Sequence, residues 1–257
     1  MTDTVLPTYS LTERDRRWTL ARTFMEQEGL DALLVVGEHE DSGAGSLYVD
    51  TWFTNDRAGC TVVFPREGEP VMLVPIGTYL TCHMDAANKG EQQWLPPENL
   101  RIGHDSGAIT ATLNEFGLAG GTIGVVGLEP FGPFHPEGLV NYPLWNTILQ
   151  RFPDATFEPV TPGISRLLAL LSEEEITVVR HSARIGDAMA QAMVETARPG
   201  VPSSRARFTR PVWAWHTDAA RSSQECISAP GHIRWAGDHR SGLLARRPRE
   251  SFRTATS

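Results

Sequence analysis

The start of the chain shows a helical and then a strand-like apolar pattern. Residues 11–30 predict an amphipathic helix that Thr12 caps and that Gly29, in the left-handed conformation, ends. Apolar residues recur within it at three- and four-residue spacing: Trp18, Ala21 and Met25. The continuous apolar run Ala32–Val36 that follows has the length of a buried β-strand.

Later apolar runs predict a hairpin and then an alternation of helices and strands. The hairpin comprises strands at residues 59–64 and 70–74, joined by a turn at residues 66–69. The remaining elements are helices at residues 78–88 and 139–151 and strands at residues 122–128 and 156–160. Strands that alternate with helices are typical of an α/β domain with a covered sheet, which we place at residues 8–160.

The segment after this domain contains the best-specified helix of the chain, at residues 172–204. Residues 161–171 predict a linker that includes a short helix. Ser172 and Glu175 then form a capping box, in which each side chain satisfies the other residue's backbone N–H group. Apolar and small residues keep helical spacing from there to Pro199-Gly200: Ile176, Val179, Ala183, Gly186, Ala190, Met193 and Ala197. We expect this stripe to pack closely against a partner element.

The balance of charge reverses near residue 204. Residues 205–257 carry ten arginines and four acidic residues, a local balance of +6, whereas residues 1–204 carry 13 basic and 27 acidic side chains, a balance of −14. The tail also lacks a sustained period of a helix or strand, so we predict it to be irregular or disordered. The net charge of −8 argues against nucleic acid as a partner.

Cysteine usage and hydropathy indicate where the protein is found. The cysteines Cys60, Cys82 and Cys226 are scattered and odd in number, which fits a reducing cytoplasm. The sequence contains no run near the roughly 18 apolar residues of a membrane span. Residues 1–10 show no basic region followed by an apolar run, which would mark export. We therefore expect a cytoplasmic protein with no membrane partner.

Four segments, through their order and spacing, resemble the creatinase/aminopeptidase P/prolidase family. They are the helix end and strand at residues 28–35, the aromatic residues 48–53, the hairpin residues 68–74 and the block at residues 171–201. Residues 48–53 are similar to the opening of a family strand, and the last block is similar to the helix that opens the family's pita-bread catalytic domain. The resemblance covers residues 11–202. It implies an amino-terminal domain with a mixed sheet flanked by helices, followed by that long helix.

The family also implies a chemistry for its full-length members. Peptidases of the family hold two divalent metals (Mn, Co or Zn) through two aspartates, a histidine and two glutamates. The metals activate a water and polarise the carbonyl, which leads to C–N bond hydrolysis in a small peptide or an amidine-like substrate. Those ligands lie beyond the helix that ends at Ala197, and the acidic and histidine residues of the tail do not match the motif: Asp218, Asp238, His216, His232 and His239. We therefore expect no catalytic residue, no metal ligand and no cofactor in this chain.

Two hypotheses about function remain open, and with them the question of whether the chain is an enzyme. In the first, the chain is a truncated, inactive member of the Xaa-Pro peptidase/creatinase metallohydrolases, owing to a reading-frame shift just after Val201-Pro202. A genuine disordered tail is the competing explanation for residues 205–257. In the second, the chain is a stand-alone dimerisation or ligand-binding module without catalysis. Because family members are usually homodimers, we expect a homodimer.

The aromatic segment and the residues directly after it contain the candidate binding residues. In dimeric relatives this region of one subunit can approach the neighbouring subunit's active site. The resemblance therefore implies an aromatic wall at Phe53 and a carboxylate-binding fork at Asn55 and Arg57. A strand edge and loop without a binding role is the interpretation that we favour for residues 52–57.

Other chemically suggestive clusters are better explained as structure. Adjacent residues rarely converge on one ion, so the Glu-His-Glu-Asp run at residues 38–41 favours a solvated loop. Neighbouring helix positions point about 100° apart, so Cys82-His83 favours a packed cysteine beside a partly exposed histidine over a nucleophile–base pair. His104-Asp105-Ser106 favours a turn. The glycines of residues 120–127 lack the G-x-G-x-x-G pattern and favour a turn and strand start.

Overall fold

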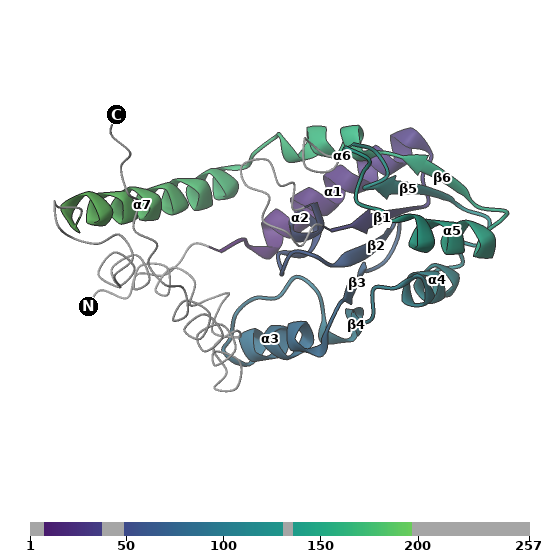
Figure 1. Ribbon diagram of the computed structural model, residues 1–257, viewed down its shortest axis with the longest axis horizontal. Coiled ribbons are helices and arrows are strands. Elements are labelled where there is room, and N and C mark those ends of the chain that lie inside the picture. Colours follow the sequence, from purple (N-terminus) through teal and green to yellow (C-terminus); the bar gives the residue numbers. More distant parts are fainter. Residues whose placement is uncertain (1–7, 38–48, 131–135, 197–257) are drawn as a thin grey trace, which may run out of the picture. The chain divides into compact units, whose positions relative to one another are not determined.

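The computed structural model describes residues 8–37, 49–130 and 136–196, and within them six strands form one mixed sheet. The strands are β1 (Ala32–Val36), β2 (Thr61–Pro65), β3 (Val71–Val74), β4 (Leu100–Ile102), β5 (Thr122–Val126) and β6 (Thr156–Pro159). Their order in the sheet is β4-β3-β2-β1-β5-β6 (Figure 1). The pairs β1–β2 and β2–β3 are antiparallel, whereas β1–β5, β3–β4 and β5–β6 are parallel. The predicted α/β class with a mixed sheet is confirmed.

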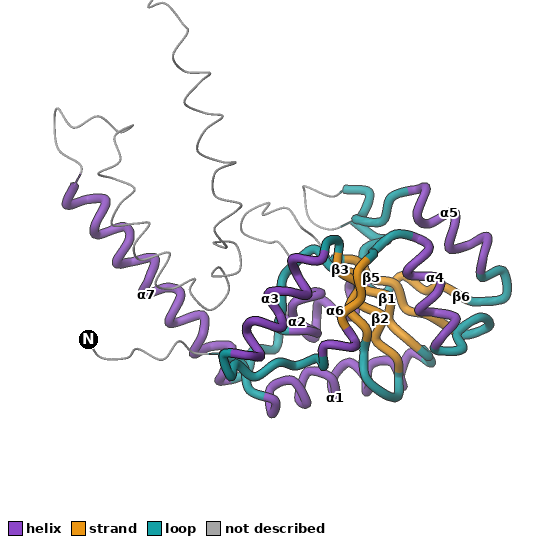
Figure 2. Tube along the Cα trace, turned by 90° about the horizontal axis from the view of Figure 1, so that it is seen from below, coloured by secondary structure: helices purple, strands orange, loops and turns teal. Residues whose placement is uncertain are grey.

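Helices cover both faces of the sheet. They are α1 (Leu11–Glu28), α2 (Val49–Thr54), α3 (Gly77–Asn88), α4 (Ser106–Glu115), α5 (Tyr142–Arg151) and α6 (Thr161–Leu168), and the chain then continues into α7 (Glu173–Thr196). Alternate residues of β1 point to opposite faces: Leu33 packs with Trp18 of α1, whereas Leu34 packs with Ile109 of α4 and Ile148 of α5. Figure 2 shows the strands between α1 on one side and α4 and α5 on the other. Burial on both faces explains why these strands are continuous apolar runs.

The first helix and the hairpin agree with the sequence-based predictions. α1 buries Trp18, Ala21 and Met25 and ends at Gly29, whose φ of 69° is left-handed. The helix begins at Leu11 as predicted, but the prediction of Thr12 as its cap is wrong, because the Ser10 side chain accepts a hydrogen bond from the Glu13 N–H group. The hairpin β2–β3 forms as predicted, with its two strands antiparallel.

The prediction of a strand at residues 48–53 is wrong, because residues 49–54 form α2. Two hydrogen bonds close its single turn: the Thr54 hydroxyl donates to the Asp50 carbonyl at 2.9 Å, and the Asn55 N–H donates to the Thr51 carbonyl at 2.8 Å. The helical turn places Trp52 and Phe53 in the core beside α1. Tertiary burial therefore overrides the strand preference of an aromatic and β-branched segment.

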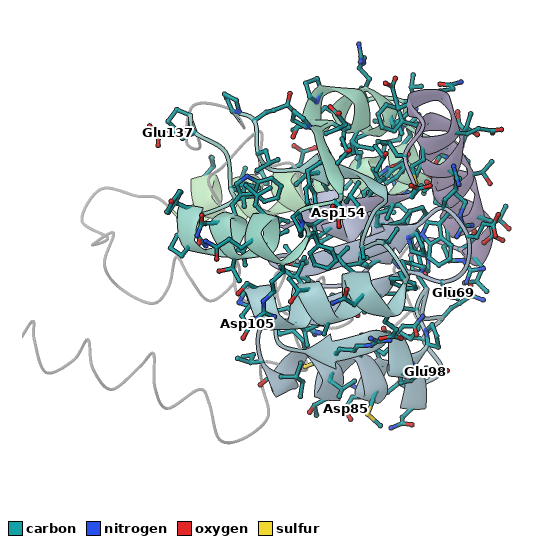
Figure 3. All side chains as sticks on the ribbon, turned by 90° about the vertical axis from the view of Figure 1, so that its right-hand side faces the viewer. Glu69, Asp85, Glu98, Asp105, Glu137 and Asp154 are labelled. Carbon is teal, nitrogen blue, oxygen red and sulfur yellow. The ribbon has the colours of Figure 1, made fainter. Side chains whose placement is uncertain are left out.

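Two elements between residues 100 and 115 have no counterpart among the predictions. β4 extends the sheet beside β3, and α4 covers it from the face of Leu34. His104 and Asp105 lie in the connection between β4 and α4, in line with the predicted turn, and Asp105 (labelled in Figure 3) caps α4 by accepting from the Ala108 N–H at 2.8 Å. Threonines at positions 110 and 112 bond back to helix carbonyls and mask the amphipathic pattern in the sequence.

The linker helix and the start of the long helix also form as predicted. α6 lies against α1 so closely that a methyl group on Gly163 would lie 2.5 Å from the Phe24 ring. The capping box is confirmed, with Ser172 Oγ accepting from Glu175 N–H at 3.1 Å and Glu175 Oε2 accepting from Ser172 N–H at 2.7 Å. Further along α7, Val179 is 54% exposed. Residues 197–257 lie outside the described residues.

Candidate functional site

The most chemically dense region follows α2, in what we call the 55–60 loop (residues 55–60). Asn55 ends α2 with a φ of 49°. Asparagine tolerates this left-handed conformation better than other residues with a Cβ atom, so it turns the chain out of the helix. The loop then leads into β2, and its residues are held from three sides.

Carboxylates hold the two ends of the 55–60 loop. Oδ2 of Asp50 accepts a hydrogen bond from the Cys60 N–H at 2.9 Å. Oδ1 of Asp56 accepts from the Arg57 N–H at 2.7 Å and lies 3.7 Å from the Arg57 guanidinium. The Cys60 thiol donates to the Arg57 carbonyl at 3.4 Å. These contacts fix the path of the chain around Arg57.

Two side chains of α3 complete the support. Tyr79 donates its hydroxyl hydrogen to the Ala58 carbonyl at 3.2 Å, and its ring lies 5.9 Å from the Arg57 guanidinium carbon. His83, four residues later on the same helix face, places Nδ1 2.8 Å from Asp56 Oδ2 and Nε2 3.0 Å from the Leu95 carbonyl. The loop is therefore bound to α3 at both Ala58 and Asp56.

Burial dominates the electrostatics of this region. Asp50 is 0% exposed, and the loss of solvent raises its pKa to about 6, although hydrogen bonding from the Cys60 N–H opposes the shift. Its Oδ1 has no hydrogen-bond partner among the described residues. Burial, together with the negative charges of Asp50 and Asp56, also raises the pKa of the Cys60 thiol. Cys60 is therefore a packed thiol and not a nucleophile.

The structure places the three candidate binding residues within one stretch but in different environments. Phe53 is 0% exposed and packs edge-on against Trp52 and at a tilt against Phe64. Its ring lies in the core, where it supports α2. Asn55 and Arg57 lie in the 55–60 loop, and the Arg57 side chain is 22% exposed. The positions that can meet a ligand are thus the loop residues, with Phe53 packed behind them.

The other sequence candidates have structural places. His83 is 3% exposed, so the prediction of a partly exposed histidine is wrong, whereas Cys82 is packed as predicted. Both ring nitrogens of His83 contact groups other than Cys82, which leaves no nucleophile–base pair. Residues 120–121 form the predicted turn before β5, where Asp31 accepts from the Thr122 N–H. Residues 38–41 lie outside the described residues.

The described residues offer no donor set for a metal pair. No group of three or more His, Cys, Asp or Glu side chains gathers there in a metal-binding arrangement. Figure 3 labels six exposed acidic residues on separate elements and loops: Glu69, Asp85, Glu98, Asp105, Glu137 and Asp154. The two divalent metals that the family resemblance implies therefore do not fit residues 8–37, 49–130 and 136–196. Among the helices in these ranges, none is both long and apolar enough to cross a membrane.

A second charged region joins the two ends of the described chain, and we call it the α1–α7 ion cluster. It consists of Glu13, Arg16 and Arg17 of α1 and Glu175 of α7. Arg17 lies 2.7 Å from Glu13 and 3.1 Å from Glu175, and Arg16 lies 2.8 Å from each of the same carboxylates.

Aromatic rings enclose the Arg17 guanidinium. Its central carbon lies 4.4 Å from the ring centre of Tyr9, 5.1 Å from that of Trp94 and 5.6 Å from that of Trp52. Burial alone would raise the pKa of Glu13, but hydrogen bonds from Arg16 and Arg17 outweigh it and lower that pKa. These charges are buried, paired with one another and enclosed by rings. They therefore hold α1 and α7 together and leave no unpaired charge to bind a ligand.

No pattern in the sequence indicates the contacts that define these two regions. Asp56 and His83 are 27 residues apart, and Arg16 and Glu175 are 159 residues apart. The capping box identified Glu175 as a helix-start residue but not as an ion-pair partner. Only the fold brings such residues together.

Comparison with known proteins supports the resemblance over the amino-terminal part. A creatinase from Bacillus sp. (strain B-0618) is 24% identical over 199 residues, which cover 77% of this chain and 44% of that protein. Two solved structures share the fold: a prolidase from Pyrococcus horikoshii OT3 (TM-score 0.52, 14% identity, 79% of this chain and 49% of that one) and an X-Pro aminopeptidase from Thermotoga maritima MSB8 (TM-score 0.50, 16% identity, 75% and 49%). No protein-family model matches the chain.

The mixed sheet with helices on both faces is the creatinase amino-terminal-like fold found in the prolidase neighbours. The chain is thus similar in sequence to a creatinase and in fold to Xaa-Pro peptidases, over the amino-terminal part of such proteins. The chain spans about half the length of the relatives that it matches.

Proposed function

We propose that the described residues are the amino-terminal part of an Xaa-Pro peptidase/creatinase-type metallohydrolase, which hydrolyses a C–N bond with two divalent metals, and that they do not catalyse the reaction themselves. The match to Bacillus creatinase over 199 residues carries this proposal. We assign residues 8–160 to the amino-terminal domain, 161–171 to a linker and 172–204 to the first helix of the catalytic domain. The metal ligands would be supplied by residues beyond α7.

Metal analysis and a peptidase assay test the proposal that the described residues neither bind the metals nor catalyse the reaction. The purified chain is expected to bind no stoichiometric Mn, Co or Zn and to leave an Xaa-Pro dipeptide intact in added manganese or cobalt, because the described residues offer no donor set. Stoichiometric metal together with turnover would contradict the proposal.

We further propose that a shift of reading frame after Val201-Pro202 separates this chain from a complete catalytic domain. The reversal of charge, from −14 over residues 1–204 to +6 over residues 205–257, supports it. Sequencing the locus tests it: an alternative frame that encodes no pita-bread domain would reject the shift and favour a genuine tail.

The 55–60 loop is the part of this chain that we assign to substrate recognition. In a homodimer, Arg57 and Asn55 of one subunit would bind the carboxylate of a peptide or amidine-like substrate in the neighbouring subunit, with Phe53 packed behind them. The fixed path of the loop around Arg57 supports this assignment, since a guanidinium binds a carboxylate well when its position is set in advance. The two buried thiols, Cys60 and Cys82, accord with a reducing cytoplasm.

A frame-restored full-length chain tests the role of Arg57. Arg57→Ala is expected to raise KM for an Xaa-Pro dipeptide roughly 10- to 100-fold, the loss of one hydrogen bond to a charged group. Arg57→Lys should recover part of the affinity, because it keeps the charge but not the planar fork. Arg101→Ala, which removes a partly exposed arginine paired with Glu115, is the matched control and should leave KM unchanged. An unchanged KM in Arg57→Ala would remove Arg57 from the site.

The alternative function is a stand-alone dimerisation or ligand-binding module. Exposed apolar residues just before and within α7 favour it, since Leu170, Leu171 and Val179 are each more than half exposed. Sedimentation of the purified chain separates the two proposals. A stable, metal-free dimer would favour the module, and a monomer would favour the separated part of a hydrolase.

A further inference from the structure

Helix α3 holds the residues on both sides of Arg57. The residue before it, Asp56, places Oδ2 2.8 Å from Nδ1 of His83. The residue after it, Ala58, accepts a hydrogen bond from the Tyr79 hydroxyl at 3.2 Å. Because Tyr79 and His83 are four residues apart on α3, both side chains leave the helix on the same face. Arg57 therefore lies in the middle of a short segment that one face of α3 restrains at two points.

Tyr79 contacts the side chain of Arg57 as well as the backbone next to it. The Tyr79 ring lies 5.9 Å from the guanidinium carbon, within the range in which the face of an aromatic ring attracts a cation. The hydroxyl of the same ring holds the Ala58 carbonyl. A single side chain thus restrains both the path of the main chain after Arg57 and the guanidinium group itself.

Tyr79 is in turn held firmly by the fold. Its side chain is buried, and α3 packs against β3 and β4 at the edge of the sheet. Burial raises the pKa of the Tyr79 hydroxyl, so this group remains protonated and able to donate at neutral pH. A buried hydroxyl needs a hydrogen-bond partner, and Tyr79 has its partner at the residue next to Arg57. A rigid helix of this kind can set the position of a binding residue that a loop carries.

Removal of the Tyr79 hydroxyl would act on the loop more than on α3. A carbonyl that loses its donor is stabilised by turning toward water. Ala58 is half-buried, so its carbonyl can reach water by a small rotation of the loop, whereas α3 is packed on the sheet. Since Arg57 directly precedes Ala58, the same rotation displaces the guanidinium from the ring.

We propose that Tyr79 is a positioning residue, which holds the Ala58 carbonyl and the Arg57 guanidinium together and thereby orients Arg57 for the carboxylate of a substrate. The proposal rests on the proposed function of Arg57 and deepens it, because it names the residue that prepares this loop for a free carboxylate. Tyr79 acts through Arg57 in this role. An arginine that is oriented in advance loses less conformational entropy when the substrate binds, which lowers KM.

NMR of the purified chain tests the positioning without any substrate. Nuclear Overhauser contacts between the Tyr79 ring and the Arg57 side chain are expected in the unsubstituted chain. Tyr79→Phe keeps the ring and removes only the hydroxyl. In this variant the contacts should weaken, and the Arg57 N–H should exchange with solvent roughly three- to tenfold faster, the effect of losing one hydrogen bond.

Tyr142→Phe is the matched control for the NMR experiment. It removes the hydroxyl of a tyrosine that is 77% exposed, and it should leave both Arg57 signals unchanged. Unchanged Arg57 signals in Tyr79→Phe would overturn the proposal. Absence of the ring contacts in the unsubstituted chain would also overturn it, and this measurement remains decisive even when a variant fails to fold.

Kinetics of the frame-restored full-length chain supply a readout that a merely structural role would not move. Tyr79→Phe is expected to raise KM for an Xaa-Pro dipeptide roughly three- to tenfold with little change in kcat. KM for the corresponding dipeptide amide, which carries no carboxylate, should stay the same. In an Arg57→Ala background the substitution should have no further effect on KM, because Tyr79 acts through Arg57. Equal losses for the two substrates, or additive losses in the double variant, contradict the proposal.

Failure of the proposed function gives a different result from failure of the positioning role. An unchanged KM in Arg57→Ala rejects the binding role of Arg57 and, with it, the role of Tyr79 that rests on it. Loss of affinity in Arg57→Ala, combined with unchanged Arg57 signals in Tyr79→Phe, keeps the binding role and rejects Tyr79 alone.

Discussion

The α1–α7 ion cluster and the 55–60 loop are both built from buried charges, but they satisfy them differently. In the ion cluster, two arginines and two glutamates share four contacts of 2.7–3.1 Å, and aromatic rings enclose Arg17. Around the 55–60 loop, Asp50 keeps an oxygen without a partner among the described residues, and Arg57 lies 3.7 Å from the Asp56 carboxylate. Each charge of the first region is paired, whereas the second region keeps one buried oxygen of Asp50 without a hydrogen-bond partner among the described residues.

This difference separates a structural joint from a candidate binding region. When every buried charge is paired, the fold carries no further penalty for an uncompensated charge, and little electrostatic attraction remains for a ligand. Incomplete pairing is costly in an isolated domain, so it is found where another group completes the charge balance or where protonation changes it. The comparison therefore predicts large, uniform stability losses in the first region and smaller, pH-dependent effects in the second.

The largest effect is expected for Arg17→Ala in the ion cluster. The change leaves Glu13 and Glu175 buried with one cation fewer, which should lower the free energy of unfolding by about 3–5 kcal/mol. Urea denaturation measures it. Arg101→Ala removes one partner of the exposed Arg101–Glu115 pair and should cost at most about 1 kcal/mol. Equal losses in the two variants would show that burial of the charges does not matter.

The ion cluster also shows which features could be predicted from the sequence and which could not. Helix α1 could be predicted because its apolar stripe and Gly29 are local signals, and the capping box could be predicted because its two residues are three positions apart. β4 and α4 were missed, since a three-residue strand and a threonine-rich helix carry weak periodicity. The pairing of Arg16 with Glu175 depends on α6 returning the chain to α1, and no spacing in the sequence encodes that return.

Contacts between residues that are distant in the sequence were even harder to predict at the candidate site. Family resemblance placed Asn55 and Arg57 in one segment, and the segment is indeed the charged loop. It could not reveal that Phe53 is enclosed, because α2 is a helix where a strand was predicted. Nor could it reveal Asp50 and His83 as supports, since their roles arise from burial against β2 and α3.

The second prediction concerns pH and the 55–60 loop. The folded protein raises the pKa of Asp50 from 3.8 to about 6, so the folded state binds a proton more tightly than the unfolded chain. Asp50 therefore contributes stability at low pH that is lost as pH rises through about 6, up to about 3 kcal/mol for a shift of two units.

Asp50→Asn should remove this loss. The difference in unfolding free energy between the variant and the native chain is expected to change between pH 4 and pH 7 in favour of the variant, as followed by urea denaturation at both values. Glu13, whose pKa is lowered, contributes in the opposite sense in both proteins and cancels in the difference. A difference that stays constant with pH would exclude Asp50 as a titrating group.

A steric change next to Asp50 should have a somewhat smaller effect. A methyl group on Gly37 would collide with the Asp50 carboxylate and lie 2.5 Å from the Cys60 carbonyl, so Gly37→Ala should cost about 1–3 kcal/mol. Gly186→Ala is the matched control, because no described atom lies within 4 Å of the added methyl and alanine favours a helix by roughly 0.5–1 kcal/mol. Thermal unfolding should move in opposite directions for the two variants, and a shift of the same sign in both would refute close packing around Asp50.

The smallest effect separates the capping box from the ion cluster that shares Glu175. Ser172→Ala removes the hydroxyl that accepts the Glu175 N–H but leaves the Glu175 carboxylate paired with Arg16 and Arg17, so it should cost only about 1 kcal/mol. Thr177→Ala, an exposed change in the next turn of α7, should be close to neutral and controls for helix propensity. Because the cap and the ion pairs share the Glu175 side chain, the loss in Ser172→Ala should add to that in Arg17→Ala only partly. Full additivity in the double variant would mean that the cap and the ion cluster act as separate units, even though they share the Glu175 side chain.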